Sequence, residues 1–341
     1  MLPLYARFPA LASLPRADLT TLPSPVQCVR LRDGVELWVK RDDLDAPAYG
    51  GNKVRALEFL LGGVRAGDVV LTLGGEGSTH VLATAAHAAR LGATTTALRW
   101  PHEGSPTATA VAGEAARLCA RVLRARNAVT AVVSVALGRV RHFRDARHRV
   151  VPIGGSTPLG ALGHVNAALE LAAQVRAGAL PLPRRVVLPL GSAGTAAGLA
   201  LGFAAAALDV DVVGVRVVPR VATSGRRVLR LAAATARLIE RVSVAAGERV
   251  AVPRVDPRRV RVEHAFYGGA YGRVLDAGEH AATLLREAAA ADSTLPPLTL
   301  DPTYGAKAAA AALALAAAAP GPTLLWATFD GRWMERVSGK R

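Results

Sequence analysis

The chain has 341 residues, of which 51% are apolar and 20% are charged, so it holds ample material for a buried core and is not a disordered chain. Its length is typical of two domains of roughly 150 residues each. The formal net charge of +16 raises the question of a polyanion partner. The Arg residues are scattered, however, and aromatic residues make up only 4%, which leaves few platforms for stacking bases. We therefore expect no nucleic-acid function.

Other sequence features indicate in which cellular compartment the protein works. It contains no run of 18 apolar residues, and its N-terminus lacks a basic segment followed by an apolar one. Cys28 and Cys119 are the only cysteines, too few for a disulfide framework and not spaced as a metal site. These features predict a cytoplasmic protein with no membrane partner and no bound metal.

Short β-branched runs alternate with Ala-rich stretches, which is the pattern of an α/β fold with parallel-rich, twisted sheets flanked by helices. The predicted strands, in chain order, are Leu37–Lys40, Val69–Leu73, Thr94–Arg99, Arg121–Arg124, Val150–Ile153, Arg185–Pro189, Asp211–Val217 and Pro322–Ala327. The predicted helices are Val54–Ala66, Thr79–Leu91, Thr107–Ala120, Leu159–Ala177, Thr195–Ala207, Gly225–Ala245, Gly272–Ala291 and Lys307–Ala319. Ligands of such sheets bind at the carboxyl ends of strands, so functional residues are expected in the strand-to-helix loops.

Lys53 is the first candidate. Only four of the 42 basic residues are Lys, and Lys53 follows the segment Tyr49-Gly-Gly-Asn52 at a predicted helix start. An amine can lose its proton when it is partly buried and then attack a carbonyl, which a guanidinium cannot do. The same position could instead be an ordinary surface lysine near a helix N-terminus. Asn52 could donate and accept hydrogen bonds beside a ligand there.

The second candidate is the Gly/Ser/Thr loop from Gly191 to Gly198, which follows a predicted strand. Backbone N–H groups in such a turn can hold a phosphate, and the next helix adds the positive end of its dipole. The spacing is that of neither a P-loop nor a dinucleotide fingerprint. A tight strand–helix turn without a ligand is the alternative interpretation.

Two further loops carry polar side chains. In Leu73-Gly-Gly-Glu-Gly-Ser-Thr-His80, either Ser78 or Thr79 is the expected N-cap, and the loop could instead hold a carboxylate or a cofactor. Tyr304 follows Leu300-Asp-Pro-Thr, and Tyr271 lies in a Gly-rich stretch. Loops are poor places for core tyrosines, so both phenols could face the same cleft.

In chain order these segments resemble the pyridoxal-phosphate (PLP) family of D-cysteine desulfhydrase and 1-aminocyclopropane-1-carboxylate (ACC) deaminase, enzymes of the tryptophan-synthase-β-like fold type II. The most specific part is Trp38-Val-Lys-Arg-Asp-Asp-Leu44 followed by Gly50-Gly-Asn-Lys-Val-Arg-Ala-Leu-Glu-Phe-Leu60. The resemblance implies a large domain of residues 1–54 and 162–341, with a smaller α/β domain of residues 55–161 inserted and the cofactor between them. It also implies a homodimer.

The resemblance assigns roles residue by residue. Lys53 would hold PLP as a Schiff base and move the Cα proton, with Ser78, Tyr304 and Tyr271 as further catalytic residues. The remaining cofactor contacts would come from Asn52, Thr79, Gly191, Ser192, Ala193, Gly194 and Thr195. Ser78, Thr79 and His80 would bind the carboxylate of a small amino-acid substrate.

The choice of reaction depends on departures from the family pattern. Gly305 follows Tyr304 where the deaminase has Glu, which argues against ring opening of ACC to 2-oxobutyrate. Thr79 stands where the family has Asn, and Ala193 replaces a glycine of the phosphate loop. We expect a D-cysteine desulfhydrase-like β-elimination that yields pyruvate, ammonia and sulfide. ACC deaminase and a PLP-binding protein without catalysis remain the alternatives.

Overall fold

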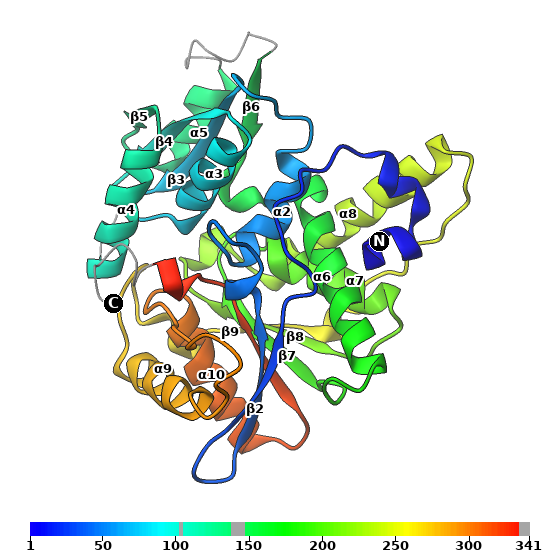
Figure 1. The fold of residues 1–341 in the computed structure, drawn as a ribbon, viewed down its shortest axis with the longest axis vertical. Coiled ribbons are helices and arrows are strands. Elements are labelled where there is room, and N and C mark those ends of the chain that lie inside the picture. The colour runs from blue at the N-terminus through cyan, green and yellow to red at the C-terminus, as the bar shows by residue number, and fades with distance from the viewer. Residues whose placement is uncertain (102–104, 138–146, 334–341) are drawn as a thin grey trace.

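The computed structural model describes residues 1–101, 105–137 and 147–333, whose strands form two sheets (Figure 1). The larger sheet has the order β1-β2-β10-β7-β8-β9, and only the β1–β2 pair is antiparallel. Its strands are β1 (Val26–Arg30), β2 (Glu36–Arg41), β7 (Arg185–Leu190), β8 (Asp211–Arg216), β9 (Val260–Glu263) and β10 (Thr323–Ala327). The smaller sheet is parallel, in the order β5-β4-β3-β6. Its strands are β3 (Val69–Gly75), β4 (Thr94–Trp100), β5 (Arg121–Arg124) and β6 (His148–Val151).

Helices cover both sheets, as the α/β pattern predicts. They are α1 (Pro3–Arg7), α2 (Asn52–Leu60), α3 (Thr79–Arg90), α4 (Pro106–Leu118), α5 (Ala128–Ala136), α6 (Pro158–Arg176), α7 (Gly194–Ala205), α8 (Gly225–Ala245), α9 (Asp276–Ala289) and α10 (Gly305–Ala318). Figure 1 shows α3, α4 and α5 around the small sheet, with α6 and α7 on one side of the large sheet and α9 and α10 on the other. The fold class expected from the sequence is therefore confirmed.

The central strands of the large sheet show why both faces are covered. In β7, Val186 and Leu188 belong to the core under α6 and α7, whereas Val187 belongs to the core under α10. In β10, Leu324 belongs to the core under α6 and α7, and Leu325 belongs to the core under α10. Successive side chains of a strand point to opposite faces, so a strand that is apolar at every position must be buried on both.

Several predicted boundaries are wrong, and three of these differences lie near a glycine or a proline. Helix α2 ends at Leu60 rather than Ala66, since Gly62-Gly63 follow and Gly63 has φ +79°. Strand β6 ends at Val151, before Pro152, so the predicted Ile153 lies in a short 3₁₀ turn. Helix α9 begins only at Asp276, four residues after the predicted Gly272.

A buried ion network joins β2 to α2 and α6. Arg55 donates to Asp42 at 2.6 Å and to Glu170 at 3.1 Å, and Lys40 donates to Glu170 at 2.6 Å. All four side chains are almost inaccessible to solvent. The rare Lys40 therefore has a structural partner, which shows that scarcity of lysine alone does not mark a reactive amine.

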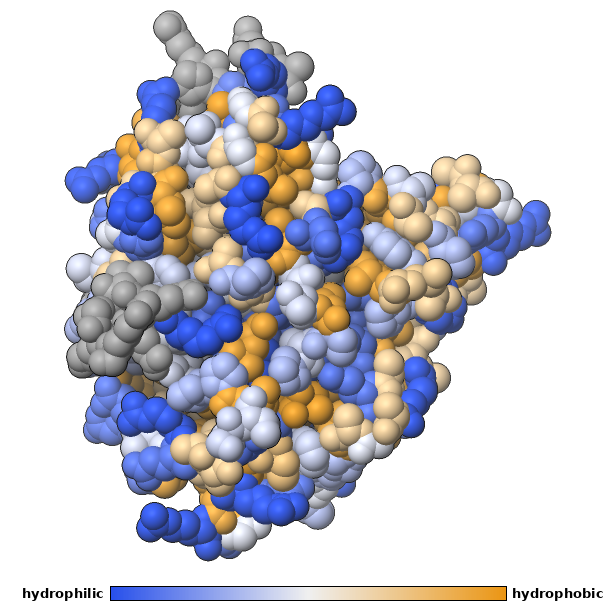
Figure 2. Space-filling model, viewed as in Figure 1, coloured by the Kyte–Doolittle hydropathy of each residue, from blue (hydrophilic) through white to orange (hydrophobic). Residues whose placement is uncertain are grey.

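Hydrophilic and apolar residues are mixed over the face shown in Figure 2. In the three described segments, no helix is long and apolar enough to cross a membrane. The same segments contain no group of three or more His, Cys, Asp or Glu that could hold a metal ion.

Candidate active site

A cavity of about 740 Å³ opens at the carboxyl ends of strands from both sheets. Gly74 and Gly75 reach it from β3, Trp100 from β4, and Pro189 from β7. This is where ligands bind in parallel α/β sheets. Of the site residues predicted from the sequence, those that line the cavity are Asn52, Lys53, Ser78, Thr79, His80, Gly191, Ser192, Tyr271 and Tyr304.

Lys53 lies in the first turn of α2 and faces this cavity. Its side chain is partly buried, and burial lowers the pKa of the amine to about 8. No other described residue forms a hydrogen bond or an ion pair with that amine. The preceding turn is tightly packed, because Gly51 has φ +107° and a Cβ there would lie 2.5 Å from the Thr328 carbonyl oxygen. The glycines of this motif thus make room for neighbouring main chain, which fixes the start of α2.

The loop from Gly191 to Thr195 connects β7 to α7. Ala193 is its left-handed residue, with φ +76°, and forms the N-cap of α7. Gly191 and Ser192 line the cavity, whereas Ala193, Gly194 and Thr195 are not among its lining residues. The amides of Ser192, Ala193 and Thr195 have no acceptor among the described residues. Ser156 holds the loop from the other side, since its hydroxyl donates to Ser192 Oγ at 2.7 Å and accepts from the Gly194 amide at 3.1 Å.

One hydrogen bond connects the lysine turn to this loop. Asn52 Nδ2 donates to Thr195 Oγ1 at 2.7 Å, and both side chains are buried. Because Asn52 directly precedes Lys53, the bond fixes the amine relative to the N-terminus of α7. The two motifs lie more than 130 residues apart in the sequence and share one site in the fold.

Ser78 is the N-cap of α3, and its side chain makes no capping hydrogen bond. It folds back over the end of β3, where a Cβ on Gly74 would approach Ser78 Oγ to 2.7 Å. A Ser at an N-cap normally binds a backbone amide of its own helix. Here the hydroxyl and the first amides of α3 are available to an anion such as a carboxylate.

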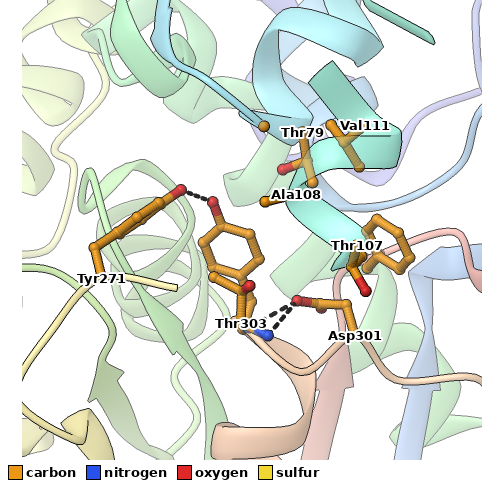
Figure 3. Close-up of a pocket in the computed structure, with 10 residues that line it drawn as sticks. Thr79, Thr107, Ala108, Val111, Tyr271, Asp301 and Thr303 are labelled. Carbon is orange, nitrogen blue, oxygen red and sulfur yellow. Dashed lines mark hydrogen bonds between the residues drawn. The ribbon is translucent and has the colours of Figure 1, made fainter. Parts of the chain in front are cut away.

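Tyr271 and Tyr304 meet through their hydroxyl groups at one end of the cavity (Figure 3). Thr79, Ala108 and Val111 lie opposite them, on α3 and α4. Burial raises the pKa of Tyr304, and a hydrogen bond with Thr79 partly opposes that rise. The Tyr304 phenol is therefore neutral at pH 7 and can donate a proton.

Asp301 fixes the turn that carries Tyr304. Its carboxylate accepts from the amides of Thr303 at 3.0 Å, Tyr304 at 2.7 Å and Gly305 at 2.9 Å. A side chain at position 305 would crowd this carboxylate, since a Cβ there lies 3.2 Å from Asp301 Oδ2. In the sequence Asp301 was noted only as part of a motif, although an Asp four residues before a helix start is a recognisable turn signal.

His80 is buried, and its Nε2 lies 3.2 Å from Thr72 Oγ1. Burial lowers its pKa to about 3, with a further contribution from the charge of Lys53. His80 is therefore a neutral imidazole at physiological pH. Several other residues of the cavity were not predicted from the sequence: Trp100, Val129, Val132, Val133, Ile153, Val218, Pro219, Ala222 and Arg227. These are mainly apolar residues with no motif to mark them.

Comparison with known proteins now places the chain in a family. Residues 19–326 match the model of the pyridoxal-phosphate dependent enzymes. The chain belongs to this family. It is 39% identical to a nocardicin C-9′ epimerase from Nocardia uniformis subsp. tsuyamanensis, over 96% of this chain and 97% of that protein. It is 36% identical to a D-cysteine desulfhydrase from Salmonella choleraesuis (strain SC-B67), over 88% of each chain. The crystal structure of an ACC deaminase homologue superimposes with a TM-score of 0.71 and 25% identity, over 98% of both chains.

The chain is therefore a PLP-dependent enzyme, and its site suits this cofactor. A primary amine of lowered pKa, without a partner, can engage the aldehyde. The unpaired amides of Ser192, Ala193 and Thr195 at the start of α7 can hold the phosphate. The Asn52–Thr195 hydrogen bond keeps these two anchor points next to each other.

Proposed function

We propose that the enzyme removes the Cα proton of an amino acid bound to PLP and then expels its β-substituent, as in the desulfhydration of D-cysteine. The observation that supports this most directly is the Asn52–Thr195 bond, which puts the free amine of Lys53 beside the anion-binding loop in one cavity. Bound PLP supplies the electron sink that makes the Cα proton acidic.

The side chains divide the work by their positions. Lys53 anchors the cofactor and, once free, moves the Cα proton, since its lowered pKa leaves a large share of neutral amine near pH 8. Ser78 Oγ, Thr79 and the first amides of α3 hold the substrate carboxylate. The Tyr271–Tyr304 pair gives a proton to the leaving group. Neutral His80 supports the carboxylate site without adding charge.

Epimerisation at Cα is the second candidate. It begins with the same proton removal but returns the proton to the other face, so it needs a second acid–base group. Two observations favour it: the tyrosine pair lines the cavity together with Lys53, and a relative 39% identical over almost the whole chain is an epimerase. Ring opening of ACC has less support, because position 305 is a glycine packed against the Asp301 carboxylate.

A panel of D- and L-amino acids separates these reactions. We expect pyruvate and ammonia from D-cysteine, whereas an epimerase gives the enantiomer and exchanges the Cα proton in D₂O without forming a keto acid. Lys53→Arg should abolish the visible absorbance of the bound cofactor and both reactions. Lys307→Arg is the matched control, because burial lowers the pKa of Lys307 to about 8 as well, yet it lies outside the cavity. An intact cofactor spectrum with neither exchange nor keto acid contradicts the proposal and leaves PLP binding without catalysis.

The organisation of the chain beyond this site stays a prediction. We propose that residues 55–161 form a domain inserted between residues 1–54 and 162–341, that two copies form a homodimer, and that the enzyme works in the cytoplasm. Light scattering tests the dimer, and limited proteolysis tests the domain boundaries.

A further inference from the structure

The cavity continues outwards beyond the residues that can hold PLP and an α-carboxylate. Its inner part contains Lys53, Ser78 and, from the anion-binding loop, Gly191 and Ser192, all of which are partly buried. Its outer part is bounded by side chains that are progressively more exposed, among them Ile153 at 36%, Val133 at 42% and Val129 at 71%. At about 740 Å³, the volume of the whole cavity lies in the upper half of the range of ~300–1,000 Å³ for ligand pockets.

Helix α5 forms one outer wall and has two apolar faces. One face, with Ala131 and Val135, packs on the small sheet. The other, with Val129, Val132 and Val133, lines the cavity. A surface helix normally turns charged or polar residues away from its core. The second apolar face of α5 is therefore directed at the cavity rather than at a sheet.

The opposite outer wall comes from the large sheet. After β8 the chain passes through Val218, Pro219 and Ala222, all of which line the cavity. Among the described residues of the cavity lining, Lys53 and Arg227 are the formally charged side chains, and none is a carboxylate. Those described residues offer a positively charged group no counter-ion, whereas an uncharged apolar group would bury its surface between the valines and Pro219.

We propose that this outer chamber, formed by Val129, Val132, Val133, Val218, Pro219 and Ala222, binds a bulky apolar group attached to the β-carbon of the amino-acid substrate. The inference rests on the proposed function and narrows its substrate from a small amino acid to one such as an S-substituted cysteine. In β-elimination the Cα proton is removed and the Cβ–S bond breaks, so the bulky group leaves as a thiol. Hydrolysis of the remaining fragment gives pyruvate and ammonia.

Binding to the holoenzyme tests the chamber independently of turnover. We would titrate D-cysteine, S-benzyl-D-cysteine and the cationic S-aminoethyl-D-cysteine while following the absorbance of the bound cofactor. Because its benzyl group is buried in the chamber, S-benzyl-D-cysteine should have a Kd at least about tenfold lower than that of D-cysteine. The cationic S-aminoethyl-D-cysteine should bind no more tightly than D-cysteine. Equal or weaker binding of the benzyl compound would overturn the proposal.

The chamber is then altered by one substitution with a matched control. Val132→Asp should bring the benzyl preference to within about twofold and leave D-cysteine binding unchanged, because a carboxylate there resists desolvation. Val244→Asp makes the same change at an exposed helical valine outside the cavity and should behave as wild type. Val129→Asp repeats the test in the first turn of α5, where a carboxylate favours the helix. A benzyl preference that survives both chamber variants places the group elsewhere and overturns the proposal.

Measurements of Cα-proton exchange and pyruvate formation distinguish failure of the proposed chamber from failure of the proposed reaction. If the benzyl preference depends on Val132 but neither compound exchanges its Cα proton or yields pyruvate, the chamber stands and the proposed reaction fails. If D-cysteine yields pyruvate and no benzyl preference is found, the reaction stands and the chamber fails.

Discussion

Asn52 Nδ2 donates a hydrogen bond to Thr195 Oγ1 over 2.7 Å, and this contact connects the first turn of α2 to the first turn of α7. One partner precedes the lysine and the other ends the anion-binding loop. The bond is buried, so water cannot replace it without cost.

Asn52→Ala should weaken PLP binding about tenfold or more, because Thr195 Oγ1 loses its donor and the two anchor points of the cofactor are no longer fixed together. Loss of the buried bond should also cost about 1–3 kcal/mol of unfolding free energy. Cofactor absorbance titrations and urea denaturation measure the two effects. Thr195→Ser keeps an acceptor and should retain most of the affinity. Unchanged PLP affinity in Asn52→Ala would show that the contact does not organise the site.

Ala193 is the second test, since a non-glycine residue at φ +76° is strained. Ala193→Gly and Ala200→Gly both remove a buried methyl group, the first from the N-cap of α7 and the second from α7 itself. Both also increase the conformational freedom of the unfolded chain. Only the first also relieves the left-handed strain. We therefore expect Ala193→Gly to be about 1–2 kcal/mol less destabilising than Ala200→Gly in urea denaturation. Equal losses would mean that the turn is not strained.

The pH dependence of cofactor capture reports the state of Lys53. Only the neutral amine attacks the aldehyde, and burial lowers the pKa of this amine to about 8. The rate at which the apoenzyme captures PLP should therefore rise with pH and reach half its maximum near pH 8. A lysine with the ordinary pKa of about 10.4 would give a midpoint more than two pH units higher. Stopped-flow absorbance follows the reaction, and Lys307→Arg should leave the midpoint in place.

The tyrosine pair is tested by removing one hydroxyl at a time. Tyr271→Phe and Tyr304→Phe should each lower kcat about 100-fold or more if the pair moves a proton, with PLP affinity unchanged. Tyr267→Phe is the control, because Tyr267 contributes a carbonyl to Lys307 and its ring to Arg216, and lies outside the cavity. Equal kcat values for all three variants would remove the pair from the chemistry.

The elements that the sequence predicted well are those with a clean period and a clear stop. Helix α8 and strand β5 have the predicted bounds, Gly225–Ala245 and Arg121–Arg124. Strands β1 and β9 and helices α1 and α5 were missed. The edge strands are short, and the Val-rich sequence of α5 has the β-branched composition of a strand. Its helical start is fixed by the capping box of Asn127 and Thr130, a local signal that composition conceals.

The residues of the candidate site also differ in whether they could be predicted from the sequence. Polar residues such as Lys53, Ser78 and Tyr304 lie at helix starts next to glycines, where their chemistry can be recognised in the sequence. Their common cavity could be expected from the rule that ligands bind at strand carboxyl ends. The apolar wall of α5 could not be predicted, because a valine reveals its role only when the fold shows which side of the helix faces the cavity.

The position of β10 has a consequence for how the protein is made. This strand is the last of the described chain, yet it lies in the middle of the large sheet, between β2 and β7. While the ribosome is still elongating the chain, β2 and β7 have no partner between them and both expose an unpaired edge. The large sheet can therefore close only after Thr323–Ala327 has been synthesised, and nascent chains that stop before Thr323 should be prone to aggregate.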